Sequence, residues 1–255
     1  MDILDRFIGC AKESLAEGYY SKAGPQTGRP RSLRKKFDSG FVLICEIKHA
    51  SPSGEYGYRS IDAEKTALDF FECGADAVSC VVEPKIFRGD ISNVALARKA
   101  GLPVLFKDFI FSNVQIDAAR RSGADCVLLV MKAVERAGAD LDSLIRHAHG
   151  IGLEVLLECY DEGELEGAAR TDADILGINN RDLSTLEVDI SRTEKILCKA
   201  GKIGRPVISE SGIRSGADIA RLKEAGASGA LVGTAIWTSG DVRAKIAELK
   251  AGASP

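Results

Sequence analysis

The sequence lacks the residue clusters that hold metals or form disulfide frameworks. It has seven cysteines, an odd number with no Cys-x-x-Cys pair, and only three histidines. His147 and His149 lie two residues apart in a helix-like stretch, so they do not share one helix face as a metal-binding pair would. We expect buried thiols in a reducing compartment at the cysteines within apolar runs, namely Cys45, Cys80, Cys126 and Cys159. No metal site is predicted.

Long apolar runs, a strong net charge and nucleotide-binding loops are also missing. No run is long enough to span a bilayer, and the first residues lack the basic and apolar regions of a secretory signal. The net charge of −3 comes from interspersed acids and bases, which argues against nucleic acid or a membrane as the main partner. No Gly-x-Gly-x-x-Gly or Walker loop occurs, so no cofactor is predicted. Because the sequence shows neither a secretory signal nor a run that could span a bilayer, we expect a cytoplasmic protein.

What the sequence does have is an alternation of short apolar runs with longer helix-like segments. The runs are rich in Val, Ile and Leu with little polar alternation, which is typical of buried parallel strands. Eight of them occur, at 41–48, 77–83, 103–107, 126–131, 154–159, 175–179, 206–210 and 229–233. Eight strand–helix units in 255 residues, 45% of them hydrophobic, predict a single (β/α)₈ TIM barrel that spans residues 1–255 as one domain.

A weak internal repeat supports the barrel. The second, fourth, sixth and eighth runs are preceded, at nearly even spacing, by Gly74-Ala75-Asp76, Gly123-Ala124-Asp125, Asp172-Ala173-Asp174 and Gly226-Ala227-Ser228. A helix end needs a small or left-handed residue before the chain turns into a strand, so the repeat predicts quarter-barrel units. The segment 138–140 has the same form, but no apolar run follows it and no strand is expected there.

The first 40 residues differ from the rest of the chain. Residues 1–18 have the pattern of an amphipathic helix, residues 24–30 form a breaker-rich loop, and Ser32 could cap another short helix. We expect this N-terminal extension to pack on the barrel rather than to form a second domain. A flexible basic tail is the alternative, which the apolar side chains of Phe7, Leu15 and Leu33 disfavour.

Polar and charged residues end most of the predicted strands. In a (β/α)₈ barrel the side chains at the C-terminal ends of the strands face the active site. Alternation along the first strand puts Glu46 and Lys48 on the same inward side. The other strand ends carry Lys107, Glu158, Asn179, Arg181, Glu210 and Thr234. Because a buried charge is costly unless it is paired or functional, several charges on one face predict a catalytic site rather than a structural ion pair.

Two of these strand ends also have the features of a phosphate site. Ser211-Gly212 after the seventh run and Gly233-Thr234 after the eighth offer backbone N–H groups and hydroxyls beside glycines, which let an anion approach the backbone closely. Loops after strands seven and eight form the recurrent phosphate site of such barrels. The pair predicts a small phosphorylated substrate, whereas glycines that serve only as turns are the alternative.

These segments resemble one enzyme family in their order along the chain. Residues 46–54 (EIKHASPSG) resemble the first-strand signature of indole-3-glycerol-phosphate synthase, and residues 105–110 (LFKDFI) resemble its third. Glu158 followed by Asp161-Glu162 resembles the fifth, and residues 177–183 (GINNRDL) and 209–213 (SESGI) resemble the sixth and seventh. The similarity extends from about residue 40 to Trp237, which is most of the chain.

The resemblance implies closure of the indole ring of 1-(2-carboxyphenylamino)-1-deoxyribulose 5-phosphate, with loss of CO₂ and water, in tryptophan biosynthesis. It implies that Lys107 is the general acid that protonates the ketone as the aromatic carbon attacks it. Lys48 and Glu158 are the candidate acid and base of the later dehydration, in an order that stays open. No cofactor is implied, and other tryptophan-pathway enzymes are candidate partners.

The same resemblance implies binding and positioning roles. Glu46 is expected to position Lys48, and Asn179 and Glu210 to orient substrate hydroxyls. Arg181 is expected to hold the substrate carboxylate or a glutamate through a bidentate contact. The expected phosphate contacts are Ser51, Ser211, Gly212, Gly233 and Thr234. The expected apolar walls for the substrate ring are Phe87, Phe109 and Leu129, of which at least one is expected to be plain core.

Three other functions stay open. Phosphoribosylanthranilate isomerase is a neighbouring phosphosugar barrel, but the first and fifth strands here lack an obvious Cys/Asp acid–base pair at their ends. A Schiff-base aldolase would use Lys107 as its nucleophile. A non-catalytic metabolite-binding barrel would keep the phosphate glycines without needing Lys107, Lys48 and Glu158 together.

The apolar stripe of residues 1–18 needs a surface to cover. Because the reaction of an apolar ring requires that water be excluded, we expect the stripe to fold over the catalytic mouth as part of a lid. A dimer interface and a plug of the barrel bottom are the alternatives.

Overall fold

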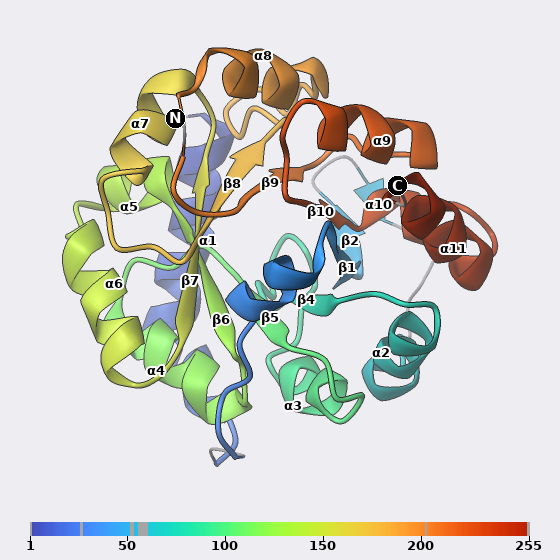
Figure 1. The fold of residues 1–255 in the computed structure, drawn as a ribbon. Coiled ribbons are helices and arrows are strands. Elements are labelled where there is room, and N and C mark those ends of the chain that lie inside the picture. The colour runs from blue at the N-terminus through green and yellow to red at the C-terminus, as the bar shows by residue number, and fades with distance from the viewer. Residues whose placement is uncertain (1, 26–27, 52–53, 56–60, 202, 254–255) are drawn as a thin grey trace.

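Eight parallel strands close a barrel at the centre of the structure (Figure 1). The computed structural model describes residues 2–25, 28–51, 54–55, 61–201 and 203–253. The barrel strands are β1 (Val42–Ile47), β4 (Ala77–Val81), β5 (Val104–Lys107), β6 (Cys126–Val130), β7 (Glu154–Cys159), β8 (Ile175–Asn179), β9 (Val207–Glu210) and β10 (Gly229–Val232). The ring closes where β1 pairs in parallel with β10, with Val42 opposite Gly229. The eight strands coincide with the eight apolar runs, so the predicted barrel is confirmed.

Helices follow the strands and form the outer layer, as Figure 1 shows. They are α2 (Ala63–Glu72), α3 (Ser92–Arg98), α4 (Asn113–Ser122), α5 (Met131–Ala137), α6 (Leu141–Gly150), α7 (Glu162–Ala168), α8 (Ser191–Lys199), α9 (Gly216–Glu224), α10 (Thr234–Trp237) and α11 (Val242–Ala253). After β1, a small antiparallel pair joins β2 (Ala50–Ser51) to β3 (Gly54–Glu55). Pro52 and Ser53, which belong to the first family-like signature, lie outside the described residues.

The barrel strands are buried on both faces, and alternate residues of a strand belong to different cores. Val42 and Ile44 of β1 belong to the inner cluster that fills the barrel, whereas Leu43 and Cys45 pack in the outer cluster between strands and helices. Because both faces are apolar, the sequence of such a strand shows no hydrophobic alternation. The inward row of each strand leads to the mouth of the barrel, where the polar strand ends lie.

The repeated segments have a common structural role. Their aspartates accept hydrogen bonds from the backbone N–H at the start of a neighbouring strand: Asp76 from Leu43 (2.8 Å), Asp125 from Val104 (2.9 Å) and Asp174 from Val155 (2.8 Å). The N–H of each aspartate donates in return to the carbonyl of the same residue. The repeat therefore fastens neighbouring strands together in pairs at the bottom of the barrel. Gly138 instead ends α5 in the left-handed conformation and leads into α6, so no strand follows it, as expected.

The first helix of the N-terminal extension, α1 (Ile3–Ala16), packs across the mouth of the barrel. Asp2 caps it, and Leu4, Phe7 and Ile8 are buried in the same inner cluster as the barrel interior. Arg136 of α5 forms ion pairs with Asp2 and Asp5, at 2.7 and 3.1 Å, which fixes the start of the helix. The apolar stripe thus covers the end of the barrel that carries the polar strand ends.

The last part of the extension closes the opposite end of the barrel. The carboxylate of Glu154, the first residue of β7, accepts hydrogen bonds from the N–H groups of Leu33 (2.7 Å) and Arg34 (2.8 Å) and from the Ser32 hydroxyl. Leu33 is buried in the inner cluster, and Phe37 of η2 (Arg34–Ser39) packs against the same cluster. Figure 1 views the molecule from this end, with η2 in front of the strands and α1 behind them. A plug of the barrel bottom exists, but η2 and Leu33 form it rather than the stripe of residues 1–18.

The described residues include no helix with both the length and the apolarity that crossing a bilayer would require.

Candidate active site

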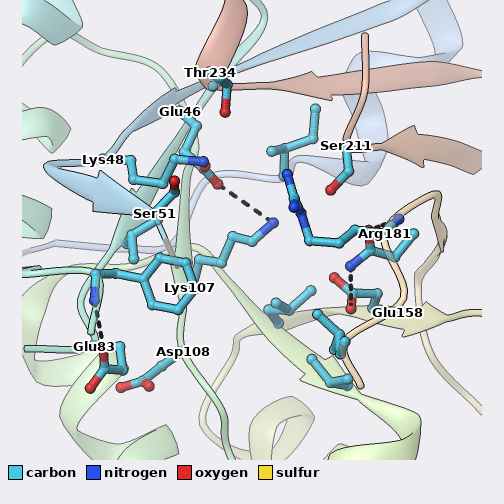
Figure 2. Close-up of a pocket in the computed structure, with 18 of the residues that line it drawn as sticks. Glu46, Lys48, Ser51, Glu83, Lys107, Asp108, Glu158, Arg181, Ser211 and Thr234 are labelled. Carbon is cyan, nitrogen blue, oxygen red and sulfur yellow. Dashed lines mark hydrogen bonds and ion pairs between the residues drawn. The ribbon is translucent and has the colours of Figure 1, made fainter. Parts of the chain in front are cut away.

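A cavity opens at the C-terminal ends of the barrel strands, beneath α1. The predicted residues that line it are Glu46, Lys48, Ser51, Phe87, Lys107, Phe109, Glu158, Asn179, Arg181, Ser211, Gly212, Gly233 and Thr234. Figure 2 shows many of them pointing into one space from different strands. Glu210 lies behind them, in contact with Lys107. Within the described part of the chain, no group of His, Cys, Asp and Glu is arranged to hold a metal ion.

Two lysines and two glutamates form a connected chain of charges across the cavity. Lys48 Nζ lies 3.0 Å from Glu46 Oε1. Lys107 Nζ lies 3.5 Å from Glu46 Oε2, the contact drawn in Figure 2. It also lies 2.8 Å from Glu210 Oε2, so this ammonium bridges two carboxylates. Strands β1, β5 and β9 therefore place their charged ends together, although Glu46 and Glu210 lie far apart in the sequence.

The opposite charges in this cluster favour the ionised forms of Glu46 and Lys107. Burial works against the charged form of Glu46, but Lys48 and Lys107 outweigh it and lower the pKa of Glu46 to about 2. Burial likewise works against the ammonium of Lys107, but the carboxylates of Glu210 and Glu46 raise its pKa well above its ordinary value. Lys107 is therefore a firmly protonated ammonium beside two carboxylates, which suits it to stabilise and protonate a developing oxyanion.

Glu158, at the end of β7, has the opposite electrostatic environment. Burial and the neighbouring charge of Glu210 raise the pKa of Glu158 to about 8, although Lys107 works in the other direction. Its Oε1 accepts a hydrogen bond from Asn179 Nδ2 at 2.9 Å. The raised pKa favours the protonated form of this carboxyl, so Glu158 is a potential proton donor in the cavity.

Glu210 is held by its surroundings and keeps one oxygen without a hydrogen bond. Its Oε2 accepts from Lys107, whereas its buried Oε1 has no hydrogen-bond partner among the residues that the structure describes. A Cβ added at Gly177 of β8 would clash with Oε1, so glycine leaves the room that this carboxylate occupies. Glu210 therefore acts on the cavity through Lys107, which lines it.

The two glycines of the predicted phosphate site are required for different reasons. Gly212 has φ +81°, and Ser211 before it has φ +68°, a conformation that is strained for a residue with a side chain. Gly233 does not have a positive φ, but a Cβ there would lie 2.7 Å from Glu46 Oε1. Gly212 thus permits the turn, and Gly233 gives space to the Glu46 carboxylate.

Asn180 fixes the strained turn at Ser211 from behind. Its Nδ2 donates to Ser209 Oγ (2.9 Å) and to the carbonyl of Ser211 (3.0 Å). Its Oδ1 accepts from the Thr193 hydroxyl at 2.8 Å. Asn180, Ser209 and Thr193 are all buried, so this network holds the turn where it borders the cavity.

Three aromatic rings form the apolar side of the cavity. The ring centroid of Phe7 lies 5.7 Å from that of Phe87 and 5.0 Å from that of Phe109. The prediction that Leu129 forms part of this wall is wrong, because Leu129 is buried in the outer cluster. Its neighbours Leu128 and Val130 line the cavity instead. Because β6 is apolar on both faces, the sequence did not reveal which residues point inward.

The comparisons with known proteins agree with this geometry. The sequence model of the family described as Indole-3-glycerol phosphate synthase matches residues 10–249. The chain belongs to this family. A protein named indole-3-glycerol phosphate synthase from Bacillus mycoides is 39% identical over 241 residues, 94% of each chain. One of the same name from Bacillus cereus strain AH820 is 39% identical over 242 residues, again 94% of each.

More distant solved structures share the fold of this synthase-family chain. Tryptophan synthase from Mycobacterium tuberculosis superposes with a TM-score of 0.65 at 16% identity, covering 89% of this chain and 99% of that one. Thiamine phosphate pyrophosphorylase from Pyrococcus furiosus superposes with a TM-score of 0.63 at 19% identity, covering 87% and 98%. At such identities the likeness concerns the barrel alone.

Sequence reasoning missed several residues that line the cavity of this synthase-family barrel. They are Phe7, Val81, Glu83, Asp108, Leu128, Val130, Leu183, Ile213, Leu231 and Val232. The sequence did indicate Asp108, since it is a charged residue that follows Lys107 directly at the end of a predicted strand. Phe7 had a partial signal in the apolar stripe, but its contact with the cavity depends on a helix that is remote in the sequence.

Proposed function

We propose that the polar cavity closes the indole ring of 1-(2-carboxyphenylamino)-1-deoxyribulose 5-phosphate and releases CO₂ and water. Family membership supports the reaction. The observation that supports this cavity as its site is the bridging ammonium of Lys107, 2.8 Å from Glu210 and 3.5 Å from Glu46. We further propose that the protein works in the cytoplasm and that other tryptophan-pathway enzymes are its partners.

In the proposed mechanism Lys107 is the general acid of ring closure. The substrate ketone becomes an alkoxide as the aromatic carbon attacks it, and a positioned ammonium stabilises and protonates that oxygen. The carboxylates of Glu46 and Glu210 hold the ammonium in place on two sides. The proton leaves Lys107 for the new hydroxyl, and CO₂ departs from the ring carbon at which the new bond formed.

The dehydration that follows needs an acid for the leaving hydroxyl and a base for a ring-side proton. We assign the acid to Glu158, because its raised pKa keeps it protonated near neutral pH. Lys48 then remains the candidate base, with Glu46 at 3.0 Å to position it. To accept the ring-side proton it must first release one of its own to the solvent, so that it acts as the neutral amine. Asn179 orients Glu158 through its amide, and Arg181 binds the substrate carboxylate from the adjacent loop.

The phosphate is proposed to bind between the ends of β9 and β10. Ser211, Gly212, Gly233 and Thr234 line one side of the cavity, and Ser51 reaches it from the loop after β1. Backbone N–H groups at the turn of Ser211 and Gly212 are suited to an anion because the turn is fixed by Asn180.

Thr234→Asp tests this phosphate site. The added carboxylate should repel the substrate phosphate and raise KM by at least about tenfold, which corresponds to about 1.4 kcal/mol. Inorganic phosphate should raise the melting temperature of the parent by mass action but leave that of the variant unchanged. Ala95→Asp adds the same charge on the exposed face of α3, away from the ends of β9 and β10, and should behave as the parent. Equal protection of all three proteins by phosphate would put the site elsewhere.

Phe7→Ala tests the proposed role of α1 as part of a lid. The substitution removes the ring that contacts Phe87 and Phe109, so KM should rise about tenfold from lost apolar burial of the substrate ring. Leu33→Ala is the matched control, because it removes a buried side chain of the same extension at the opposite end of the barrel. It should destabilise the fold by about 2–5 kcal/mol without changing KM. A KM that is normal in Phe7→Ala as well would refute the lid.

Deleting residues 1–38 would not separate these effects, because the deletion removes the contacts at both ends of the barrel. The point substitutions act on one end each.

A Schiff-base aldolase is the strongest competing enzyme. Its lysine must be a neutral amine to attack a carbonyl. The carboxylates around Lys107 favour its ammonium form instead, which supports the synthase. Borohydride should therefore trap no covalent adduct when the substrate is added, whereas an aldolase would be trapped.

One assay decides the proposed function. The purified protein is mixed with 1-(2-carboxyphenylamino)-1-deoxyribulose 5-phosphate, and indole fluorescence is followed. An increase that depends on enzyme concentration supports the proposal. If the protein binds the substrate but produces neither an increase in indole fluorescence nor CO₂, it is a metabolite-binding barrel instead.

A further inference from the structure

Two neighbouring tyrosines in the N-terminal extension reach the loops that carry the aromatic wall. Tyr19 and Tyr20 lie in η1 (Tyr19–Lys22), directly after α1, and both are buried. Their ring centroids are 5.3 Å apart in an edge-to-face arrangement. Neither residue lines the cavity, and the mechanism above uses neither of them. Each hydroxyl nevertheless forms hydrogen bonds with a different loop at the mouth of the barrel.

Tyr20 bonds to the loop after β5. Its hydroxyl donates to Asp108 Oδ2 at 2.8 Å and accepts from Gln115 Nε2 at 3.0 Å. The other oxygen of Asp108 accepts from the N–H of Phe109 at 2.7 Å, and Gln115 also donates to the carbonyl of Phe109 at 2.9 Å. Tyr20, Asp108 and Gln115 are buried, so a network of buried hydrogen bonds holds the loop.

Tyr19 bonds to the loop after β4. Its hydroxyl donates to the carbonyl of Val82 at 2.8 Å and accepts from the N–H of Ile91 at 2.9 Å. These two residues are the ends of the loop that carries Phe87. Within that loop, the Glu83 carboxylate accepts from three consecutive N–H groups, those of residues 85, 86 and 87. Both loops with aromatic rings are thus tied to one short segment of the extension.

Asp108 is the point at which this segment acts on the site. It lies between Lys107 and Phe109 in the chain, and its carboxylate borders the cavity (Figure 2). A shift of Asp108 therefore moves the ring wall on one side and the backbone of Lys107 on the other. Burial raises the pKa of the Asp108 carboxyl to about 7, and the Tyr20 hydroxyl works against that rise by favouring the charged form.

We propose that Tyr20 is a positioning residue that, through Asp108, holds the aromatic wall of the ring subsite and the adjacent Lys107 in register. This inference rests on the proposed function. It goes beyond the lid, because the lid explains how α1 excludes water and not how the loop after β5 is fixed. A hydrogen bond that is remote from the ligand then contributes to ring binding rather than only to stability.

Tyr20→Phe tests this proposal, since it removes the hydroxyl and keeps the ring. Two ligands are compared: indole-3-glycerol phosphate, which carries a ring, and glycerol 3-phosphate, which does not. We expect the Kd of the ring-bearing ligand to rise about tenfold and kcat to fall about tenfold, a size consistent with loss of a hydrogen bond to a charged group. The Kd of glycerol 3-phosphate should stay within about twofold of the parent value.

Arg31→Met is the matched control. Arg31 belongs to the same extension, but its guanidinium donates to the carbonyls of Arg98 (3.1 Å) and Leu102 (3.0 Å) at the bottom of the barrel. It should lower the melting temperature and leave both Kd values and kcat unchanged. If Tyr20→Phe behaves in the same way, its role is structural and the proposal is wrong. An equal rise of both Kd values would also overturn it, because the effect would not be specific to the ring.

The outcome for the parent separates this proposal from the proposed function. If the parent makes no indole-3-glycerol phosphate, while Tyr20→Phe still loses affinity for the ring-bearing ligand alone, the proposed function is refuted and Tyr20 is supported as a positioning residue. A parent that binds neither ligand would overturn both.

Discussion

Lys107→Ala is expected to reduce kcat by about two to four orders of magnitude, the usual loss when a general acid is removed. The substitution deletes the ammonium that lies between Glu46 and Glu210. Without that cation the substrate oxyanion has no proton donor at this position, and the two carboxylates repel its charge. Single-turnover measurement of indole formation reports the effect on chemistry separately from product release.

The same substitution should also destabilise the fold. Removing one partner of a buried ion pair costs up to about 3–5 kcal/mol, and less where the remaining carboxylates take up a proton. Lys107→Gln fills more of the vacated space and should be the more stable variant, with kcat as low as that of Lys107→Ala. Lys65→Ala, on the exposed face of α2, should leave both quantities unchanged. Turnover of Lys107→Gln within about tenfold of the parent would remove Lys107 from the mechanism.

Glu158→Gln is expected to give the second large effect, a loss of about two to three orders of magnitude in kcat. Glutamine keeps an oxygen that can accept from Asn179, so the change removes the acidic proton with little change in shape. The folded protein should be at least as stable, because a buried carboxyl is replaced by a neutral amide.

The pH dependence distinguishes an acid from a base at this position. Because the pKa of Glu158 is raised to about 8, its proton is present below that pH and is lost above it. If Glu158 is the acid, kcat/KM of the parent should fall as pH rises through about 8, and Glu158→Gln should lack this limb. Asp108 also lines the cavity and has a pKa raised to about 7, so Asp108→Asn is the control and should keep the limb. A rate that rises through pH 8 would make Glu158 the base.

The positions of the strands and of most charged site residues were predictable for a local reason. Each strand is a short apolar run, and its polar end follows directly in the sequence, so finding the strand also finds the end. Lys107 after residues 104–106 and Glu158 after residues 155–157 are examples. The topology of a parallel barrel then brings all such ends to one side, whatever their separation along the chain.

The directions of the apolar side chains were not predictable in the same way. Strand β6 is buried on both faces, so Leu128 and Leu129 look alike in the sequence although only Leu128 borders the cavity. The sequence offered two reasons for a glycine at position 233, a phosphate contact or a turn. The structure adds a third reason, the nearby Glu46 carboxylate, which belongs to a strand at the other end of the chain.

The extension shows the same limit over a longer range. Its apolar stripe predicted a helix with one buried face. That this face would cover the mouth of the barrel was predicted from the need of the reaction to exclude water, not from a local sequence signal. Nothing local revealed that residues 32–39 would close the bottom, or that Tyr20 would meet Asp108, because both contacts join segments that are far apart in the sequence.

By itself, the sequence determined the barrel, the order of its strands, the charged strand ends and the family, because periodicity, turn residues and motifs are local properties of the chain. Only the tertiary structure decided which face of each apolar strand points inward, how Lys107 is shared between Glu46 and Glu210, and which loops the tyrosines hold. Those features depend on distances between residues of different strands and helices. Such distances are set by closing and packing the barrel as a whole, which no single segment encodes.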